Sequence, residues 1–273
     1  GVEEGQAEII VCEQNFHGRT TTIVGFSSDA LSRDGFGPFT PGFRVIPYGD
    51  SDALASAITP NTVGFLVEPL QGEAGVVVPP DGYFGRCVEI CRANGVLVIN
   101  DEIQTGLGRT GKMFCGDWDG HRGDIMIVGK ALGGGVFPVS GILSNSDIMD
   151  VFTPGNHGST FGGNPLGAAV GRAALEVIQE EKLVDQSNDL GQWFMGELKS
   201  INSPHIAEVR GRGLMIGVVI KESSGTARPF CEALQQRGIL AKETHEQVIR
   251  FAPPLVIEKE TLEWALPNIA EVV

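Results

Sequence analysis

The sequence has few basic residues for its length. It carries 20 Lys and Arg against 34 Asp and Glu among 273 residues, a formal net charge of −14. A nucleic acid or an anionic membrane surface requires a basic face on its partner, so this balance argues against both. Long apolar runs are also lacking, and no stretch approaches the roughly 20 residues of a membrane-spanning helix. We therefore expect neither nucleic acid nor membrane among the partners.

Cysteine is scarce, and its count of 5 is odd. A long chain with an odd count does not suit a disulfide framework, so we expect a reducing compartment: the cytoplasm, with the mitochondrial matrix as the alternative. Cys87 and Cys91 are four residues apart on a predicted helix. No second ligand pair follows at zinc spacing, so we interpret both as buried thiols and expect no metal site.

Three short apolar runs each lead into charged residues. Parallel strands buried on both faces have this unbroken apolar character, and ligands bind beyond the carboxyl ends of such strands. The charged residues should therefore meet at one edge of a sheet. The runs are residues 63–67 before Glu68, residues 96–99 before Asp101 and Glu102, and residues 125–128 before Lys130.

The order of predicted elements indicates an α/β fold with a mostly parallel sheet. Strand-like and helix-like segments alternate from residue 7 to about residue 180. Beyond residue 183 the pattern changes to strands and helices of a smaller sheet. We therefore predict a large domain in residues 1–183 and a small C-terminal α/β domain in residues 184–273.

Lys130 and Asp101 together predict Schiff-base chemistry. Lys130 follows a buried strand and precedes the glycines at 133–135, which let backbone approach a ligand closely. A lysine amine forms an imine with an aldehyde cofactor, whereas the ordinary alternative is a solvated surface lysine. A buried Asp101 needs a cationic partner, and the pyridine nitrogen of pyridoxal phosphate supplies one. Glu102, the next residue on the strand, should face the other way.

A magnesium pair formed by Asp101 and Glu102 in a nucleotide hydrolase is the competing interpretation. The sequence lacks a phosphate-binding loop of the Gly-x-x-x-x-Gly-Lys type, so we discount it.

Several motifs resemble those of the class III pyridoxal-phosphate aminotransferases, which have the fold of type I pyridoxal-phosphate enzymes. The motifs are residues 101–106 (Asp-Glu-Ile-Gln-Thr-Gly), 108–111, 129–135 and 158–165. Within the class, the members that act on ornithine are the most similar, on residues 35–39, 68–75 and 250–255.

The resemblance implies a set of cofactor-binding roles. Lys130 would hold pyridoxal phosphate covalently and shuttle a proton to and from the substrate. Asp101 would pair with the pyridine nitrogen, and Gln104 would hydrogen-bond the ring hydroxyl. Phe16 would stack on one face of the ring, and Ile103 would pack on the other.

The resemblance also implies roles in substrate binding and assembly. Ser159 and Thr160 would bind the cofactor phosphate of a neighbouring subunit, which implies a homodimer or a higher homo-oligomer. Arg250 would bind the α-carboxylate of the glutamate and 2-oxoglutarate pair, and Arg19 the second carboxylate. Glu73 would neutralise Arg250 when ornithine binds.

Each role has an ordinary structural alternative. Phe16 could be core packing. Ser159 and Thr160 could cap the following helix. Arg250 could form a surface ion pair that contributes little. His17 is interpreted as a turn histidine with satisfied hydrogen bonds and no catalytic role.

The activity implied is transfer of the ornithine δ-amino group to 2-oxoglutarate, giving glutamate semialdehyde and glutamate. Acetylornithine or 4-aminobutyrate is the alternative donor. The resemblance starts after the family's N-terminal portion, which includes a glycine-containing turn that binds the cofactor phosphate. We therefore expect an N-terminally incomplete large domain, and a non-catalytic truncated fragment is the second alternative.

Overall fold

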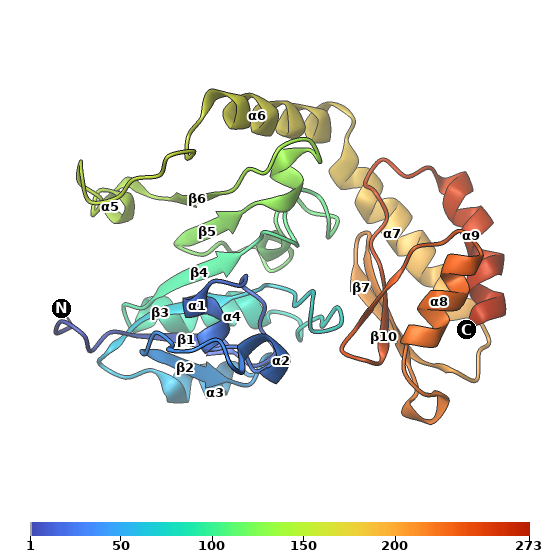
Figure 1. Cartoon of the computed structure of the whole chain (residues 1–273), viewed down its shortest axis with the longest axis horizontal. Helices are drawn as coiled ribbons and strands as arrows, with labels where there is room; N and C mark the ends of the chain where they lie inside the picture. Colours follow the sequence, from blue (N-terminus) through green and yellow to red (C-terminus); the bar gives the residue numbers. More distant parts are fainter. Residues whose placement is uncertain (1) are drawn as a thin grey trace. The chain divides into compact units, whose positions relative to one another are not determined.

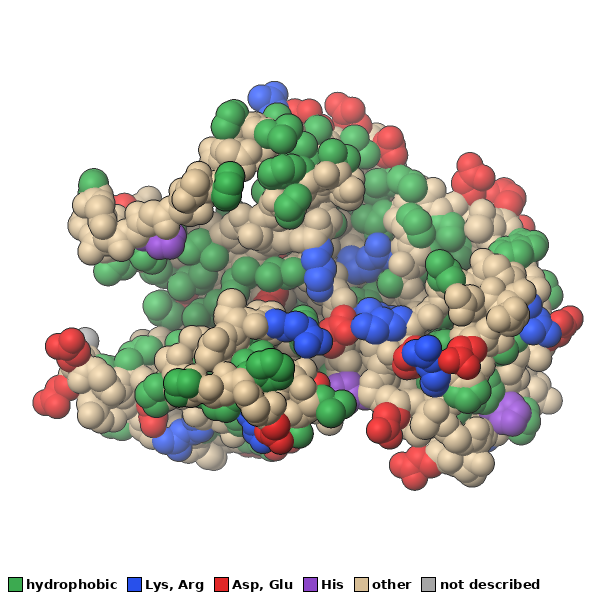
Figure 2. Space-filling view, viewed as in Figure 1, with side chains coloured by type: hydrophobic (Ala, Val, Ile, Leu, Met, Phe, Trp, Pro, Cys, Tyr) green, Lys and Arg blue, Asp and Glu red, His purple; other side chains and the backbone are tan. Residues whose placement is uncertain are grey.

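The computed structural model describes residues 2–273, which form two compact units. The large unit comprises the chain up to Pro69, Pro79–Gln104 and Gly116–Val177. The small unit comprises Leu70–Val78, Thr105–Cys115 and Ile178–Val273. Figure 1 labels most helices and strands of each unit. Figure 2 shows acidic side chains scattered over one face rather than gathered in a patch.

The large unit is built on a six-stranded sheet within the described residues, in the order β2-β1-β3-β4-β5-β6. The pairings from β2 through β5 are parallel, and β6 runs antiparallel to β5. The prediction of a mostly parallel sheet is therefore confirmed. The strands are β1 Glu8–Cys12, β2 Phe43–Ile46, β3 Thr62–Val67, β4 Leu97–Asp101, β5 Ile125–Val128 and β6 Gly141–Ser144.

Local sequence signals set the helix ends of the large unit. Asp50 caps α3 because its Oδ1 accepts hydrogen bonds from the amides of Asp52 and Ala53, both at 2.9 Å. Gly95, at φ 68°, follows the end of α4 in the left-handed conformation that glycine adopts readily. The helices are α1 Thr21–Gly25, α2 Ala30–Arg33, α3 Ser51–Ala57, α4 Tyr83–Ala93, α5 Ser146–Met149 and most of α6 Pro165–Glu180, with 3-10 turns η1 Cys115–Trp118 and η2 Lys130–Gly133.

The main core of the large unit lies between the sheet and helices α3 and α4. The strand side chains in it are fully or almost fully buried, as an unbroken apolar strand requires. Each large side chain contributes about 1.5–3 kcal/mol by leaving water. Cys87 and Cys91 are both fully buried there, as small apolar side chains. Other members include Ile10, Phe65, Val67, Phe84, Val88 and Val98.

The small unit has an antiparallel four-stranded sheet in its described residues, ordered β7-β8-β10-β9. One apolar core joins this sheet to its helices, with Phe194, Leu198 and Ile249 at or below 1% exposure. The elements are α7 Leu183–Ser200, β7 Ile206–Arg212, β8 Met215–Ile220, η3 Glu222–Ser224, α8 Arg228–Gln236, β9 Lys242–Thr244, β10 Val248–Phe251 and α9 Lys259–Val272.

Two loops from earlier in the chain belong to the small unit. Arg210 donates to the carbonyls of Gly75 and Val76, both at 2.9 Å, which anchors the loop at 70–78. Arg109 donates to the carbonyl of Leu214 at 3.0 Å and so anchors the loop at 105–115. Both loops precede residue 183 in the chain and cluster with the small unit. The domain division at residue 183 stays a prediction.

Candidate active site

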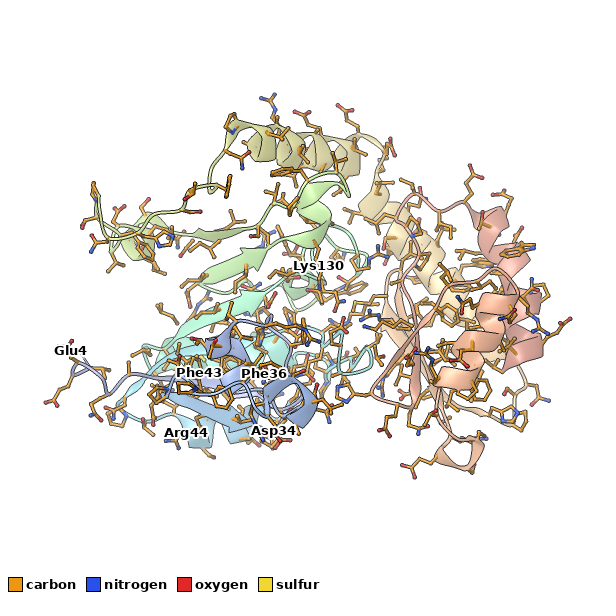
Figure 3. All side chains as sticks on the ribbon, in the orientation of Figure 1. Glu4, Asp34, Phe36, Phe43, Arg44 and Lys130 are labelled. Carbon is orange, nitrogen blue, oxygen red and sulfur yellow. The ribbon has the colours of Figure 1, made fainter. Side chains whose placement is uncertain are left out.

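The ends of three neighbouring strands of the large unit carry the charged residues of the candidate site. β3, β4 and β5 are adjacent and parallel, so their carboxyl ends share one edge of the sheet. Glu68 directly follows β3, Asp101 ends β4, and Lys130 comes two residues after β5. The predicted convergence of these residues on one edge is therefore confirmed. Lys130 is labelled in Figure 3.

The Asp101 carboxylate is buried and held from two sides. Its side chain is 5% exposed, and its Oδ2 lies 2.8 Å from His17 Nδ1. The amide of Ile103 donates to the other oxygen, Oδ1, at 3.0 Å. Each oxygen thus has one fixed partner, and the carboxylate is oriented before any ligand binds.

His17 is the residue that sequence reasoning missed. Its side chain is 2% exposed, and its Nε2 is buried without a hydrogen-bond partner among the described residues. The interpretation as a satisfied turn histidine is therefore wrong. His17 contacts a carboxylate 84 positions away, and no local pattern announces such a pairing.

The turn that carries Phe16 is tied to the end of β3. The Phe16 amide donates to Oε2 of Glu68 at 3.1 Å, and the hydroxyl of Tyr48 donates to the Glu68 carbonyl at 3.0 Å. Glu68, 6% exposed, thus fixes the turn rather than standing in solvent. The Arg19 guanidinium lies 5.6 Å from the centre of the Phe16 ring, within cation–π range.

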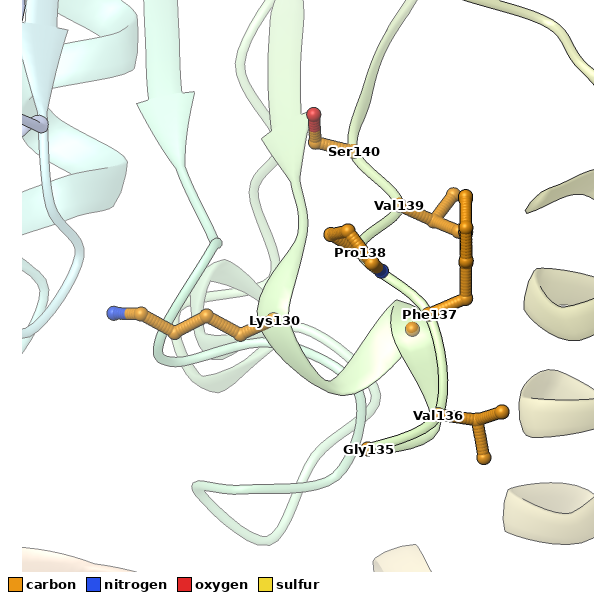
Figure 4. Close-up of a pocket in the computed structure, with 8 residues that line it drawn as sticks. Lys130, Gly135, Val136, Phe137, Pro138, Val139 and Ser140 are labelled. Carbon is orange, nitrogen blue, oxygen red and sulfur yellow. The ribbon is translucent and has the colours of Figure 1, made fainter. Parts of the chain in front are cut away.

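Lys130 has an unusual backbone for a residue with a side chain. Its φ of 44° lies in the left-handed region, which costs a non-glycine residue about 1–3 kcal/mol and marks functional sites. It begins the 3-10 turn η2 between Gly129 and the left-handed Gly134. Figure 4 shows its side chain extending away from Val136 and Phe137, with which Lys130 lines one pocket.

The residues next to Asp101 have separate tasks. Ile103 packs close to the residue before Lys130, since a Cβ added at Gly129 would lie 3.5 Å from Ile103 Cγ1. Glu102, 1% exposed, accepts a hydrogen bond from the amide of Gly116 at 2.9 Å and fixes that segment. Gln104 is half-buried.

Ser159 and Thr160 lie on an exposed loop of the large unit, between α5 and α6. Ser159 Oγ accepts a hydrogen bond from the amide of Gly162 at 2.9 Å, which stabilises the turn before α6. Both side chains therefore face outward from the unit that contains Asp101 and Lys130.

The small unit holds the other two residues with expected substrate roles. Arg250, on β10, donates from an Nη1 group 2.7 Å from Glu73 Oε1, and its side chain is only 12% exposed. A surface ion pair therefore does not describe this contact. Lys242 Nζ lies 3.6 Å from Glu73 Oε2. Burial lowers the pKa of nearby Arg109 to about 10, with the positive charge of Arg250 as a further cause.

The side chains of the large unit fit pyridoxal phosphate in their chemistry. A buried carboxylate suits a protonated ring nitrogen, an amine suits an aldehyde, an amide suits a hydroxyl, and Phe16 and Ile103 offer apolar surfaces. No group of three or more metal-ligating side chains occurs in residues 2–273. In the same residues, no helix has the length and hydrophobicity needed to span a bilayer.

The fold and this constellation of residues define a pyridoxal-phosphate enzyme with a type I architecture. A family model described as aminotransferase class-III matches residues 2–273. The chain belongs to this family, whose members depend on pyridoxal phosphate.

Several named aminotransferases resemble the chain in sequence or in structure. The ornithine aminotransferase of Brevibacillus brevis is 59% identical over 271 residues, which cover 99% of this chain and 67% of that protein. A crystal structure of the ornithine aminotransferase from Toxoplasma gondii, with partial occupancy of PLP at its active site, matches with a TM-score of 0.97 and 44% identity, over 99% of this chain and 65% of that one. The acetylornithine aminotransferase from Elizabethkingia anophelis matches with a TM-score of 0.87 and 48% identity, over 100% of this chain and 68% of that one. The chain thus spans about two thirds of the length of the proteins it resembles.

Proposed function

We propose that the protein transfers the δ-amino group of ornithine to 2-oxoglutarate, giving glutamate semialdehyde and glutamate. The observation that carries this proposal is the ion pair between Arg250 and Glu73, at 2.7 Å. An arginine that must bind a carboxylate in one half-reaction has to be neutralised when a diamine binds in the other. The identity of 59% to an ornithine aminotransferase supports the same donor.

The residues of the large unit would hold pyridoxal phosphate. The cofactor supplies an aldehyde for the amino group and a ring that withdraws electrons from the reacting carbon. Asp101 would keep the ring nitrogen protonated, with His17 and the Ile103 amide orienting its carboxylate. The Lys130 amine would take and return the proton at the substrate carbon that carries the nitrogen.

Other contacts would position the cofactor within the site. Phe16 and Ile103 would pack on the two faces of the ring, and Gln104 would hydrogen-bond the ring hydroxyl. The hydrogen bond from the Phe16 amide to Glu68 supports the stacking role of Phe16, because it fixes the turn that carries the phenyl ring.

Two arginines would bind the dicarboxylate substrate. Arg250 would take the α-carboxylate of 2-oxoglutarate or glutamate, because a planar guanidinium matches a carboxylate with paired hydrogen bonds. Arg19 would take the second carboxylate. Its stacking on Phe16 supports a role near the cofactor ring.

Acetylornithine is the second candidate donor. The match to an acetylornithine aminotransferase at 48% identity and a TM-score of 0.87 favours it over unrelated amines. Acetylation removes the positive charge of the α-amino group and adds bulk, so the two donors differ in what the pocket must accept near Glu73.

We also propose that the protein acts as a homodimer in a reducing compartment, the cytoplasm. Large apolar side chains stand exposed in the segment that carries Ser159 and Thr160 and in the separate segment before β6, which supports contact with a second copy. The segment with Ser159 and Thr160 would bind the cofactor phosphate of the neighbouring subunit. All 5 cysteines are buried and free, which suits a reducing compartment. The exposed side chains include Val136 at 79%, Val151 at 74%, Phe161 at 80% and Leu166 at 58%.

The first experiment traps the cofactor on its lysine. Borohydride reduction after addition of pyridoxal phosphate, followed by peptide mass spectrometry, should place the label on Lys130. Turnover of ornithine, acetylornithine and 4-aminobutyrate is then compared, and ornithine should have the largest kcat/KM. Labelling scattered over many lysines would support the alternative of a non-catalytic fragment. A larger kcat/KM for another amine would show that this amine, and not ornithine, is the preferred donor.

A further inference from the structure

Two cationic residues are paired on neighbouring strands of the small sheet. In the antiparallel pairing of β9 with β10, Lys242 stands directly opposite Arg250. Like charges in directly opposed positions of a sheet are destabilising, so this arrangement requires an anion nearby. Glu73, from the loop at 70–78, supplies that anion.

The Glu73 carboxylate contacts both cations, one with each oxygen. Its Oε1 lies 2.7 Å from Arg250 Nη1, and its Oε2 lies 3.6 Å from Lys242 Nζ. The three side chains differ in exposure: Arg250 is 12% exposed, Glu73 25% and Lys242 63%. The closer partner is thus the more buried one, and the more distant partner has room to move.

The backbone under Glu73 is held in place. Gln71 and Val77 form a β-bridge across the loop, and Arg210 binds the carbonyls of Gly75 and Val76. Because the loop is fixed, rotation of the Glu73 side chain is the simplest way for its carboxylate to leave Arg250.

Two other arginines of this region are committed elsewhere. Arg109 donates to the carbonyls of Leu214 and Pro253, at 3.0 and 2.6 Å. Arg210 donates to the loop carbonyls and to Glu208 at 3.0 Å. Lys242 has a long, exposed side chain, so its ammonium group can stay with the Glu73 carboxylate when that carboxylate moves away from Arg250.

We propose that Lys242 is a specificity-determining residue that receives Glu73 when a dicarboxylate occupies Arg250. This role rests on the proposed function. With a diamine bound, Glu73 neutralises Arg250. With a dicarboxylate bound, Glu73 pairs with Lys242, so that the two carboxylates do not compete for one arginine. Without Lys242 the displaced carboxylate would lose the attraction of this cation, and opening of the Arg250–Glu73 pair would cost more.

The test separates the two half-reactions in protein loaded with pyridoxal phosphate. Cofactor absorbance in a stopped-flow instrument reports the reaction with ornithine and, separately, the return reaction with 2-oxoglutarate. Lys242→Gln should lower kcat/KM for 2-oxoglutarate about tenfold, equivalent to about 1.4 kcal/mol, and change that for ornithine less than about twofold. Lys242→Arg keeps the charge and should retain most of the activity toward both.

Lys259→Gln is the matched control for net charge. Lys259 is a half-exposed lysine of α9 that pairs with Glu263 and contacts Trp193, so its loss should leave both half-reactions unchanged. A second measurement uses equilibrium binding of glutarate, a dicarboxylate without an amino group. Lys242→Gln should weaken glutarate binding and reduce its dependence on salt.

The outcomes distinguish this role from the proposed function. If wild-type protein transaminates ornithine and Lys242→Gln lowers both half-reactions equally, or neither, the role of Lys242 is wrong. If wild-type protein does not act on ornithine, the proposed function is wrong. In that case unchanged glutarate affinity in Lys242→Gln would still overturn the role of Lys242.

Discussion

His17 Nδ1 lies 2.8 Å from Asp101 Oδ2, and both side chains are almost completely buried. A carboxylate oxygen accepts only, so the shared proton belongs to Nδ1 of the imidazole. The opposite nitrogen, Nε2, has no partner in the described residues. His17 is thus a buried polar side chain whose one hydrogen bond within residues 2–273 goes to Asp101. This indicates that its role is to fix the position of the Asp101 carboxylate.

The first prediction tests His17 as a positioning residue. His17→Phe keeps an aromatic ring and removes the hydrogen bond, so the affinity for pyridoxal phosphate should fall about tenfold, as expected for a hydrogen bond to a charged group. The pH dependence of the bound cofactor's absorbance should shift as well. His17→Gln, which can still donate, should recover part of both. An unchanged dissociation constant and spectrum in His17→Phe would limit the histidine to packing.

The second prediction concerns the backbone strain at Lys130. Lys130→Gly and Lys130→Ala should both abolish turnover, because each lacks the amine. Their stabilities should differ: the φ of 44° suits glycine, so Lys130→Gly should be about 1 kcal/mol more stable than Lys130→Ala. Urea unfolding of the cofactor-free proteins measures this difference. Equal stabilities of the two variants, or a more stable Lys130→Ala as at an ordinary helix position, would contradict a strained backbone at this residue.

The third prediction addresses the ion pair in the small unit. Glu73→Gln leaves Arg250 positively charged when ornithine binds, so kcat/KM for ornithine should fall about tenfold or more, consistent with loss of a charged hydrogen bond. The value for glutamate should fall by less than about threefold. A larger loss of kcat/KM for ornithine than for glutamate would support neutralisation of Arg250 by Glu73. Equal losses for the two donors would count against it.

Strand positions in the large unit were predictable because they depend on local pattern. β3, β4 and β5 are unbroken apolar runs that stop at charged residues, and the structure has all three within two residues of the expected bounds. β2 was missed because it lies at the sheet edge, half-exposed, in a segment rich in glycine and proline. β7 was missed because its sequence, Ile-Ala-Glu-Val-Arg-Gly-Arg, is mostly polar.

Contacts that join distant parts of the chain were harder to predict. Arg250 and Glu73, 177 positions apart, were paired only through the family resemblance. His17 and Lys242 carry no distinguishing local pattern. Their partners follow from strand order and register, which fix what stands beside Asp101 and what stands opposite Arg250.

The fourth prediction follows from the buried thiols. Burial raises the pKa of Cys12, Cys87 and Cys91 from 9.0 to about 12, and that of Cys231 to about 11. Above pH 9 these thiols ionise in the unfolded chain while they stay protonated in the folded one. The folded state then binds more protons, so stability should be constant below pH 9 with respect to the thiols and should fall as pH rises toward 12. Burial also raises the pKa of Tyr83, which adds to the loss at high pH.

Urea midpoints at neutral pH and at about pH 10.5 measure this effect, since that pH lies between the ordinary and the raised values. Cys91→Ala should lose less stability between the two conditions than wild-type protein does. A wild-type midpoint that is the same at both pH values would show that the thiols titrate alike in the folded and unfolded states.

The last prediction compares two glycines on one helix. Gly191 and Gly196 both lie in α7, but a Cβ at Gly191 would overlap the backbone of Gly213, whereas a Cβ at Gly196 would meet nothing within 4 Å. Gly196→Ala should therefore stabilise the protein by about 0.5–1 kcal/mol, as helix propensity dictates. Gly191→Ala should destabilise it by about 1–3 kcal/mol, because the backbone of Gly213 would have to move. Opposite signs in urea unfolding would establish that α7 approaches the segment before β8 at backbone distance, and equal stabilisation by both variants would refute that contact.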